Sequence, residues 1–492
     1  MKKNVFFTSF LVSIIVLLIV YGFELTHFTL SIDEEFSNNI LHTISMGRWG
    51  HALLKSTIFP EPFIPFYTEF LSLIILALSC AMISCTLNLD RIQSIFFSIL
   101  YSSLPQFAYQ LEFSNQSDTL AMGMFLCSVS TYLMLRGNGV LMTFIAPVAA
   151  LTFAVSIYQS LIFVPLSIII SYSCYCVANN RDDLRFSNII LKPSIVLLFS
   201  MIAYSLLTRL IQWHFGKSSD SYFSNMVGWL HQPAQETISS TFSFIVKYFS
   251  LDAPYGLNIY IISVLSLLVT CAPSVKNRPL YLLTSVALVT SPFLMNVFIG
   301  GLLPPRSMNC LAISFAASGV ILFSKYGYKK IIWLIPAFSL LYGTASSSRL
   351  FYTDYISFNQ DYRISSLIAN DISNYIDVPP YQPVKVYFYG AFTIDSVDKP
   401  KNHDMFGSSF LSWDAGNSAR ISAFMNVTGI AKIIPTPYSE LKSGLKQINS
   451  APTWPSKGSV FKVNDVVVVK LGLSPGNCIN GFYKNIDPTR CL

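Results

Sequence analysis

Charged side chains are scarce in this sequence. They make up 12% of its 492 residues, while 52% of the residues are hydrophobic and the mean hydropathy is +0.52. Because soluble globular proteins carry about 25% charged residues, this composition excludes a soluble chain and predicts a polytopic α-helical membrane protein. The formal net charge of +7 does not indicate nucleic-acid binding, since Lys and Arg occur in short clusters between apolar runs rather than on one basic face.

Other common features are absent from the sequence. No small-x-small cleavage pattern follows the first apolar run, residues 5–23, so we expect this run to stay in place as an uncleaved membrane anchor. No internal repeat or low-complexity tract is present. No cluster of His and Asp residues has the spacing of a metal site, so we expect no metal site.

The apolar runs predict about eleven membrane spans, since about 20 apolar residues cross the hydrocarbon core of a bilayer. The run 140–178 is nearly twice that long, and we expect it to fold back at Tyr158-Gln159-Ser160. The expected spans are residues 5–23, 66–86, 92–110, 119–135, 140–157, 160–178, 194–213, 257–271, 280–299, 308–323 and 331–347.

The basic residues predict the orientation of these spans. Lys2 and Lys3 precede the first run, and basic residues flanking spans stay in the cytoplasm, so the N-terminus is expected there. An odd number of spans then places the C-terminal segment on the opposite side. The loops 24–65 and 214–256 are expected to face that same outer side.

Residues 349–492 have a different composition from the transmembrane domain, residues 1–348. They hold 25 of the chain's 57 charged residues and no apolar run long enough to span a bilayer. We expect a small extracytoplasmic α/β domain with a helix at 354–375 and strands at 384–389 and 465–471.

The cysteines agree with this division of the chain. Cys478 and Cys491 lie close together near the C-terminus. In an oxidising compartment such a pair predicts a disulfide rather than a metal site, which would need more ligands.

Carboxylates gather just after the first span, in Ser31-Ile32-Asp33-Glu34-Glu35. A solvated loop is the simplest interpretation of such a run. Their expected place at the outer membrane face favours a second one, in which Asp33, Glu34 or Glu35 deprotonates a substrate. Glu35 is the reserve candidate, because in an extended segment it would point to the same side as Asp33 but one step farther from the span.

The same outer loop continues with apolar residues at roughly helical spacing between Phe36 and Leu54. This pattern predicts an amphipathic helix on the membrane surface. Within it, Arg48 and Trp49 would supply a cation and a ring on which a sugar can stack.

Three further polar residues are candidates for contact with a lipid headgroup. Arg306 is the only basic residue of its short outer loop, which favours phosphate binding as much as interfacial snorkelling. Gln159 either binds a headgroup or satisfies the backbone of its own turn. Lys484 either reaches the same site or is an ordinary surface lysine.

These motifs together resemble the type II O-antigen glucosyltransferases of serotype-converting phages and prophages. The resemblance covers most of the chain and rests on the order of five motifs: Ser-Ile-Asp-Glu-Glu, Gly-Arg-Trp-Gly, Ile-Tyr-Gln-Ser, Leu-Pro-Pro-Arg-Ser-Met and Trp-Asp-Ala-Gly-Asn. Relatives usually have Asp-Asp or Asp-Glu after the isoleucine. The third acid of this chain therefore leaves the identity of the base open.

The resemblance implies a GT-C type enzyme of the bacterial inner membrane. Such an enzyme takes glucose from undecaprenyl phosphate glucose and adds it to a sugar of the lipid-linked O-antigen in the periplasm, which converts the serotype. It would depend on a donor flippase and a donor-synthesising glucosyltransferase, with no cofactor and no nucleic acid. The roles implied are catalysis by Asp33, Glu34 or Glu35, phosphate binding by Arg306, Arg48 or Lys484, and substrate binding by Trp49, Gln159, Trp413 and Asp414.

Two other functions are compatible with outer acids on a multi-span protein. A lipid-linked glycan transporter or flippase usually carries ionisable groups at midmembrane depth and often an internal repeat, and neither is evident here. An O-antigen polymerase or ligase is closer in chemistry and is not excluded by the sequence.

Overall fold

The computed structural model describes residues 3–36, 40–181, 187–218, 226–272, 279–327, 329–379, 381–394 and 399–474. The chain forms two compact units. The first, here called the membrane unit, comprises Met1–Phe28, Asn39–Arg349 and Pro400–Asp404. The second, here called the C-terminal unit, comprises Thr29–Asn38, Leu350–Lys399 and Met405–Leu492. The acidic segment that follows the first helix thus belongs to the C-terminal unit.

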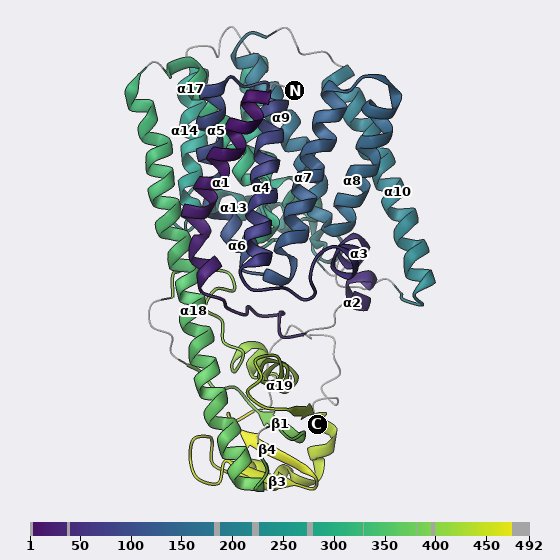
Figure 1. Ribbon diagram of the computed structural model, residues 1–492, viewed down its shortest axis with the longest axis vertical. Coiled ribbons are helices and arrows are strands. Elements are labelled where there is room, and N and C mark those ends of the chain that lie inside the picture. The colour runs from purple at the N-terminus through teal and green to yellow at the C-terminus, as the bar shows by residue number, and fades with distance from the viewer. Residues whose placement is uncertain are drawn as a thin grey trace. The chain divides into compact units, whose positions relative to one another are not determined.

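The membrane unit is built from helices, which run alongside one another in Figure 1. Among them, α1 packs on α4 and α5, and α7 packs on α4 and α8. Its helices are α1 (Lys3–Thr26), α2 (Ile40–Ser45), α3 (Trp49–Thr57), α4 (Tyr67–Thr86), α5 (Arg91–Ser103), α6 (Ala108–Leu111), α7 (Ser114–Arg136), α8 (Ala146–Ile157), α9 (Phe163–Ala178), α10 (Lys192–His214), α12 (Gly228–His231), α13 (Ala234–Lys247), α14 (Ile261–Cys271), α15 (Pro279–Thr290), α16 (Leu294–Ile299), α17 (Leu311–Tyr326) and the first part of α18 (Leu334–Ile376).

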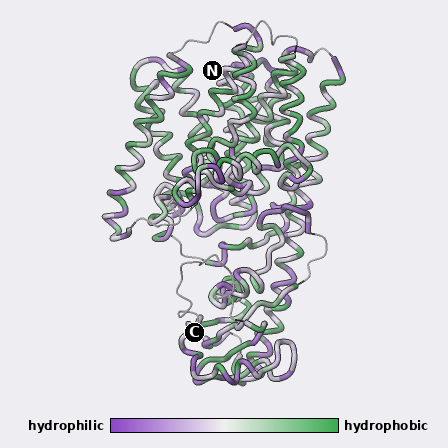
Figure 2. Tube along the Cα trace, turned by 180° about the vertical axis from the view of Figure 1, so that it is seen from behind, coloured by the Kyte–Doolittle hydropathy of each residue, from purple (hydrophilic) through white to green (hydrophobic). Residues whose placement is uncertain are grey.

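Within the described residues, seven helical segments are long and apolar enough to cross a membrane. Figure 2 shows hydrophobic residues along the helices of this unit. Three shorter apolar helical segments, Leu141–Ile157, Leu257–Cys271 and Leu311–Tyr326, coincide with further expected spans. The expected span 92–110 forms α5 and, after a break at Leu104, a 3-10 turn followed by α6. The structure therefore supports a membrane protein, while the number of eleven spans stays a prediction.

Serine side chains join the first helices of this unit. The Ser9 hydroxyl of α1 lies 2.8 Å from that of Ser84 and 2.6 Å from that of Ser98. One turn further along α1 and α5, the Ser13 hydroxyl lies 2.7 Å from that of Ser102. Small hydroxyl side chains at this spacing let helices approach closely and satisfy their polar atoms within the bundle.

The long apolar run folds back where the sequence predicts. Helix α8 ends at Ile157, Tyr158 is extended, and a 3-10 turn begins at Gln159. The predicted amphipathic helix over residues 36–54 is wrong as a single element, because it is divided into α2 and α3. Gly47 between them has a φ of +78°, and a Cβ there would lie 2.7 Å from the Tyr204 hydroxyl oxygen. Only glycine adopts such a close, left-handed turn without strain.

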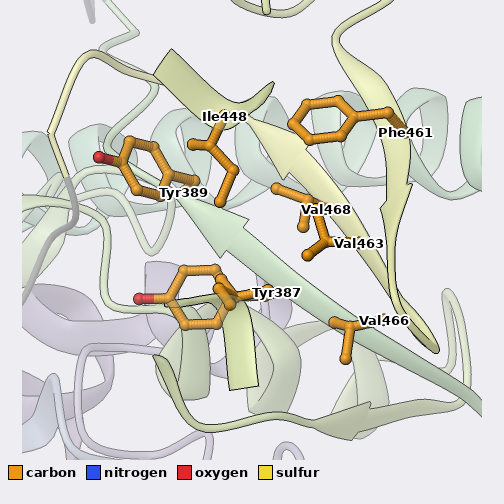
Figure 3. Packing of buried hydrophobic residues seen from close by; sticks show 8 residues of the cluster. Tyr387, Tyr389, Ile448, Phe461, Val463, Val466 and Val468 are labelled. Carbon is orange, nitrogen blue, oxygen red and sulfur yellow. The ribbon is translucent and has the colours of Figure 1, made fainter. Parts of the chain in front are cut away.

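The C-terminal unit contains a four-stranded sheet with the order β2-β1-β4-β3. Strand β1 (Val384–Tyr389) is parallel to β2 (Ile433–Pro435) and β4 (Val466–Lys470), and β3 (Val460–Val463) is antiparallel to β4. The predicted strands at 384–389 and 465–471 are confirmed to within one residue. Buried side chains from β1, β3 and β4 pack with Ile448 of α20 (Leu445–Ser450), as Figure 3 shows.

The predicted helix at 354–375 is part of a longer one. Helix α18 extends without interruption from Leu334 to Ile376 and contributes residues to both units. Its sequence changes from apolar to polar after Arg349, but nothing in this stretch, which lacks proline after Pro336, ends a helix.

Candidate active site

The acidic segment forms a tight turn rather than an extended strand. The Glu34 backbone N–H donates to the Ser31 carbonyl oxygen over 3.1 Å. Asp33, inside this turn, has a φ of +83°. This left-handed conformation is unfavourable for residues with a Cβ, although Asp tolerates it better than most.

A buried carboxylate of α18 fastens the segment within the C-terminal unit. Asp354 accepts hydrogen bonds at Oδ2 from the hydroxyls of Ser31, at 2.9 Å, and Thr29, at 3.3 Å. Its Oδ1 accepts from the Gly407 backbone N–H at 3.0 Å. Thr29 and Ser31, on either side of Leu30, thus both donate to the buried Asp354 carboxylate.

The three acids of the segment have different surroundings. Glu34 is buried, and its Oε2 accepts from the Ser31 backbone N–H at 2.9 Å. Glu35 is fully buried, and its Oε2 accepts from the Asp33 backbone N–H at 2.8 Å. The Asp33 side chain remains 61% exposed. Of the three, Asp33 is therefore the one that an incoming substrate can reach.

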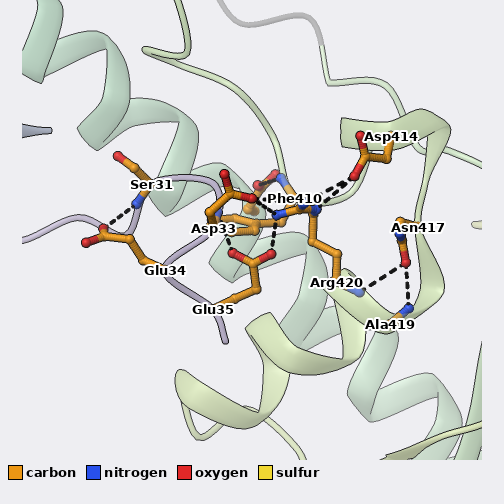
Figure 4. A network of polar contacts seen from close by, with 10 residues as sticks. Ser31, Asp33, Glu34, Glu35, Phe410, Asp414, Asn417, Ala419 and Arg420 are labelled. Atoms are coloured by element: carbon orange, nitrogen blue, oxygen red, sulfur yellow. Dashed lines mark hydrogen bonds and ion pairs between the residues drawn. The ribbon is translucent and has the colours of Figure 1, made fainter. Parts of the chain in front are cut away.

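Arg420 joins the acids to the loop before its own helix (Figure 4). Its Nη1 and Nη2 both donate to Asp33 Oδ1 over 3.1 Å, and Nη1 also donates to Glu35 Oε1. Its Nε and Nη2 donate to Asp414 Oδ2 over 3.3 and 3.1 Å. The guanidinium lies 5.5 Å from the centre of the Phe36 ring. Asp33 and Glu35 thus share one partner, Arg420, although the segment forms a turn and not the extended strand considered from the sequence.

The local structure around Arg420 is well defined by capping. Helix α19 (Ser418–Val427) begins after Asn417, whose Oδ1 accepts from the backbone N–H groups of Ala419 and Arg420. The Ser418 hydroxyl accepts from the Phe388 backbone N–H of β1 at 3.0 Å. These contacts fix the first turn of α19 on the sheet, and this turn carries Arg420.

The predicted pair Trp413 and Asp414 lies in the 3-10 turn Trp413–Ala415 just before α19. Gly416, which follows this turn, has a φ of +87°, and a Cβ there would lie 2.2 Å from the Gly390 carbonyl oxygen. Glycine is therefore needed at this position. The Asp414 side chain is 34% exposed, so it lies on the solvent-accessible side of the carboxylates around Arg420.

Burial dominates the electrostatics of this cluster. It raises the pKa of Glu35 to about 7, although the Arg420 guanidinium acts in the opposite direction. Burial lowers the pKa of Arg420, but its three carboxylate partners, Glu35 first, outweigh this effect and leave the pKa raised. The exposed Asp33 carboxylate can accept a proton from a hydroxyl, and the Arg420 guanidinium restricts its orientation.

Arg48, Trp49 and Gln159, which the sequence singled out separately, lie together in the membrane unit. Arg48 Nε donates to Gln159 Oε1 over 3.3 Å. Gln159 Nε2 donates to the Met46 carbonyl at 2.8 Å, and Trp49 Nε1 donates to the Thr208 hydroxyl at 3.1 Å. Gln159 thus satisfies the backbone of the turn between α2 and α3 rather than that of its own turn.

Arg306, in the 3-10 turn Pro305–Ser307, lies elsewhere in the membrane unit. Its Nη1 is 3.4 Å from Asp404 Oδ2, and its guanidinium lies 5.0 Å from the centre of the Phe113 ring. Burial raises the pKa of Asp404, and Arg306 counteracts this shift. The Arg306 side chain keeps 22% of its surface exposed.

Some candidates lie outside the described residues, namely Lys484 and the predicted disulfide partners Cys478 and Cys491. Among the residues that the structure describes, no group of three or more His, Cys, Asp and Glu residues is arranged to hold a metal ion.

Arg420 was missed by the sequence reasoning. The sequence feature that could have identified Arg420 is its position four residues before Phe424 in a short helix. This spacing places it on the helix face that also buries Ile421. A charged residue on an apolar helix face needs carboxylates to accompany it. The partners could not be named, because Asp33 lies 387 residues away in sequence.

Comparison with known proteins agrees with the sequence resemblance. No curated protein and no solved structure gives a significant match. The family model described as Glucosyl transferase GtrII matches residues 22–324, which include the acidic segment, the Arg48 and Gln159 cluster and Arg306 but not Arg420. Since the match covers more than half of the chain, this protein belongs to the glucosyl transferase GtrII family.

Proposed function

We propose that this protein is a GT-C type enzyme that transfers glucose from undecaprenyl phosphate glucose to a sugar of the lipid-linked O-antigen, on the periplasmic face of the bacterial inner membrane. Membership of a glucosyl transferase family supports the transferred sugar. The apolar helices of the membrane unit support a lipid-anchored donor. The observation that carries the assignment of the chemistry is the exposure of Asp33 among three acids of which two are buried.

In the proposed reaction, Asp33 is the general base. Its carboxylate takes the proton of the acceptor hydroxyl while that oxygen forms a bond to the anomeric carbon of glucose. The bond between this carbon and the phosphate oxygen breaks, and the electron pair leaves with undecaprenyl phosphate. Glu34 and Glu35 are engaged with the segment's own backbone, so we assign them to its structure.

Arg306 is our candidate for the group that stabilises the leaving phosphate. Its guanidinium is partly exposed and has a loose ion pair with Asp404. A phosphate is a better partner than one carboxylate oxygen at 3.4 Å, because it can form two parallel charge-assisted hydrogen bonds with a guanidinium. Arg48, whose Nε donates to Gln159, is the second candidate.

The test of this function is incorporation of labelled glucose. Membranes that contain the donor-synthesising enzyme, the donor flippase and the lipid-linked O-antigen are supplied with this protein or a variant. We expect wild-type protein to label the O-antigen and Asp33→Asn to reduce the rate by about 10²- to 10⁴-fold. Glu34→Gln, matched in charge change, should retain most activity if it folds.

Two results would contradict the proposal. Labelling that is independent of undecaprenyl phosphate glucose would exclude the donor. Normal labelling by a well-folded Asp33→Asn variant would exclude Asp33 as the base, and would return Glu34 and Glu35 to consideration.

A further inference from the structure

We propose that Arg420 is the positioning residue of the acidic segment: it holds one carboxylate oxygen of Asp33 and thereby aims the other at the acceptor hydroxyl. The inference rests on the proposed function of Asp33 as the base. Arg420 lies beyond the residues matched by the family model, so membership of the family assigns it no role.

The guanidinium of Arg420 uses all its hydrogen-bond donors within the protein. An arginine side chain has five N–H donors. The structure shows five donated contacts from Arg420: one from Nε, two from Nη1 and two from Nη2. All of them end on carboxylates of the same unit. All five donors therefore form hydrogen bonds within the protein. Arg420 thus orients the acids and does not bind a substrate phosphate.

The contacts to Asp33 are asymmetric. Both Nη groups donate to Oδ1, and the side chain stays 61% exposed. A carboxylate held at one oxygen keeps its plane and direction while the other oxygen accepts a proton. Positioning of this kind matters because a displacement of about 1 Å can cost about 10²-fold in rate.

Burial makes the arrangement rigid. The Arg420 side chain is 9% exposed, and that of Glu35 is completely buried. Glu35 also accepts from the Asp33 backbone N–H, so the guanidinium and Glu35 together hold the left-handed backbone of Asp33. A left-handed Asp is strained and persists only where surrounding contacts fix it.

The geometry requires a guanidinium. A lysine at position 420 would keep the charge but would have three donors on one atom and could not reach the three carboxylates in a plane. We therefore expect Arg420→Lys to lower kcat by about 10²-fold, with the KM for the lipid-linked donor changed by less than about threefold. Arg363→Lys, at an exposed position of the same unit, is the matched control and should retain full activity.

Two further measurements separate positioning from a purely structural role. Arg420→Ala should be partly reactivated by added guanidinium ion, at least about tenfold, because the ion can occupy the vacated position between the carboxylates. In a double-mutant cycle, Arg420→Lys should cost little further activity in an Asp33→Asn background, since Arg420 acts through Asp33.

The outcomes distinguish this inference from the proposed function. Full activity of Arg420→Lys, no reactivation of Arg420→Ala, or losses that multiply in the double mutant would each overturn the positioning role. Normal activity of Asp33→Asn would instead overturn the assigned base, whatever Arg420 does. If thermal unfolding shows that Arg420→Ala does not fold, the Arg420→Lys cycle still decides the matter.

Discussion

Arg420 and Arg306 are both candidates for catalytic support, but their surroundings differ. Arg420, in the C-terminal unit, has its donors on three carboxylates and is nearly buried. Arg306, in the membrane unit, has an ion pair with Asp404 at 3.4 Å and keeps 22% of its side chain exposed. A guanidinium surrounded by carboxylates organises the protein, whereas a partly exposed one with a loose ion pair can exchange its partner for an anionic ligand.

The largest effect expected from this difference is at Arg306. Arg306→Ala should lower kcat/KM for the donor by about 10²- to 10³-fold, because a group that stabilises the leaving phosphate is lost. Arg306→Lys should lose most of the activity as well, since an ammonium reproduces a bidentate contact poorly. Steady-state kinetics with purified donor lipid measures both values.

The control for this experiment is Arg91→Lys, at an exposed position of the membrane unit. A fully active Arg306→Lys variant would show that Arg306 only anchors its loop. The distinction between the two arginines would then disappear, because neither would contact a substrate.

A smaller effect concerns the pH dependence of stability at the buried end of the Arg420 cluster. The folded-state pKa of Glu35, about 7, lies above its ordinary value of 4.5. Its contribution to stability is therefore fully present below pH 4.5 and is lost as pH rises through about 7. Glu35→Gln lacks this titration.

Thermal unfolding of both proteins between pH 4.5 and 8 checks this prediction. The Tm of Glu35→Gln minus that of the wild type should increase with pH across the window from 4.5 to about 7. A difference that stays constant over that window would show that Glu35 remains ionised beside Arg420 throughout. Glu440→Gln, at an exposed position, is the control.

The smallest effect is expected at Asp404, the partner of Arg306. Asp404→Asn removes a carboxylate that competes with the donor phosphate for the guanidinium. Because a partly exposed ion pair contributes up to about 1 kcal/mol, the KM for the donor should fall by up to about fivefold. An increase in KM would show that Asp404 orients Arg306 instead of competing with its ligand.

The sequence determined the features that depend on local pattern. The composition gave a helical membrane protein, the length of the run 140–178 required the break observed at Tyr158, and β-branched and aromatic residues gave strands β1 and β4. The motif order gave the family to which the chain belongs. The apolar runs, the break and the strands are each encoded within about 20 consecutive residues, so they can be derived without knowledge of distant contacts.

The tertiary structure decided the rest. Hydrophobic spacing suggested one helix over residues 36–54, but the left-handed Gly47 against Tyr204 divides it into two. The sequence left three acids as candidates for the base, and only burial separates Asp33 from Glu34 and Glu35. The role of Arg420 could be recognised only in the structure, where Asp33, 387 residues away in sequence, lies within hydrogen-bonding distance of it. Ion pairing depends on position in space and leaves no periodic pattern in the chain.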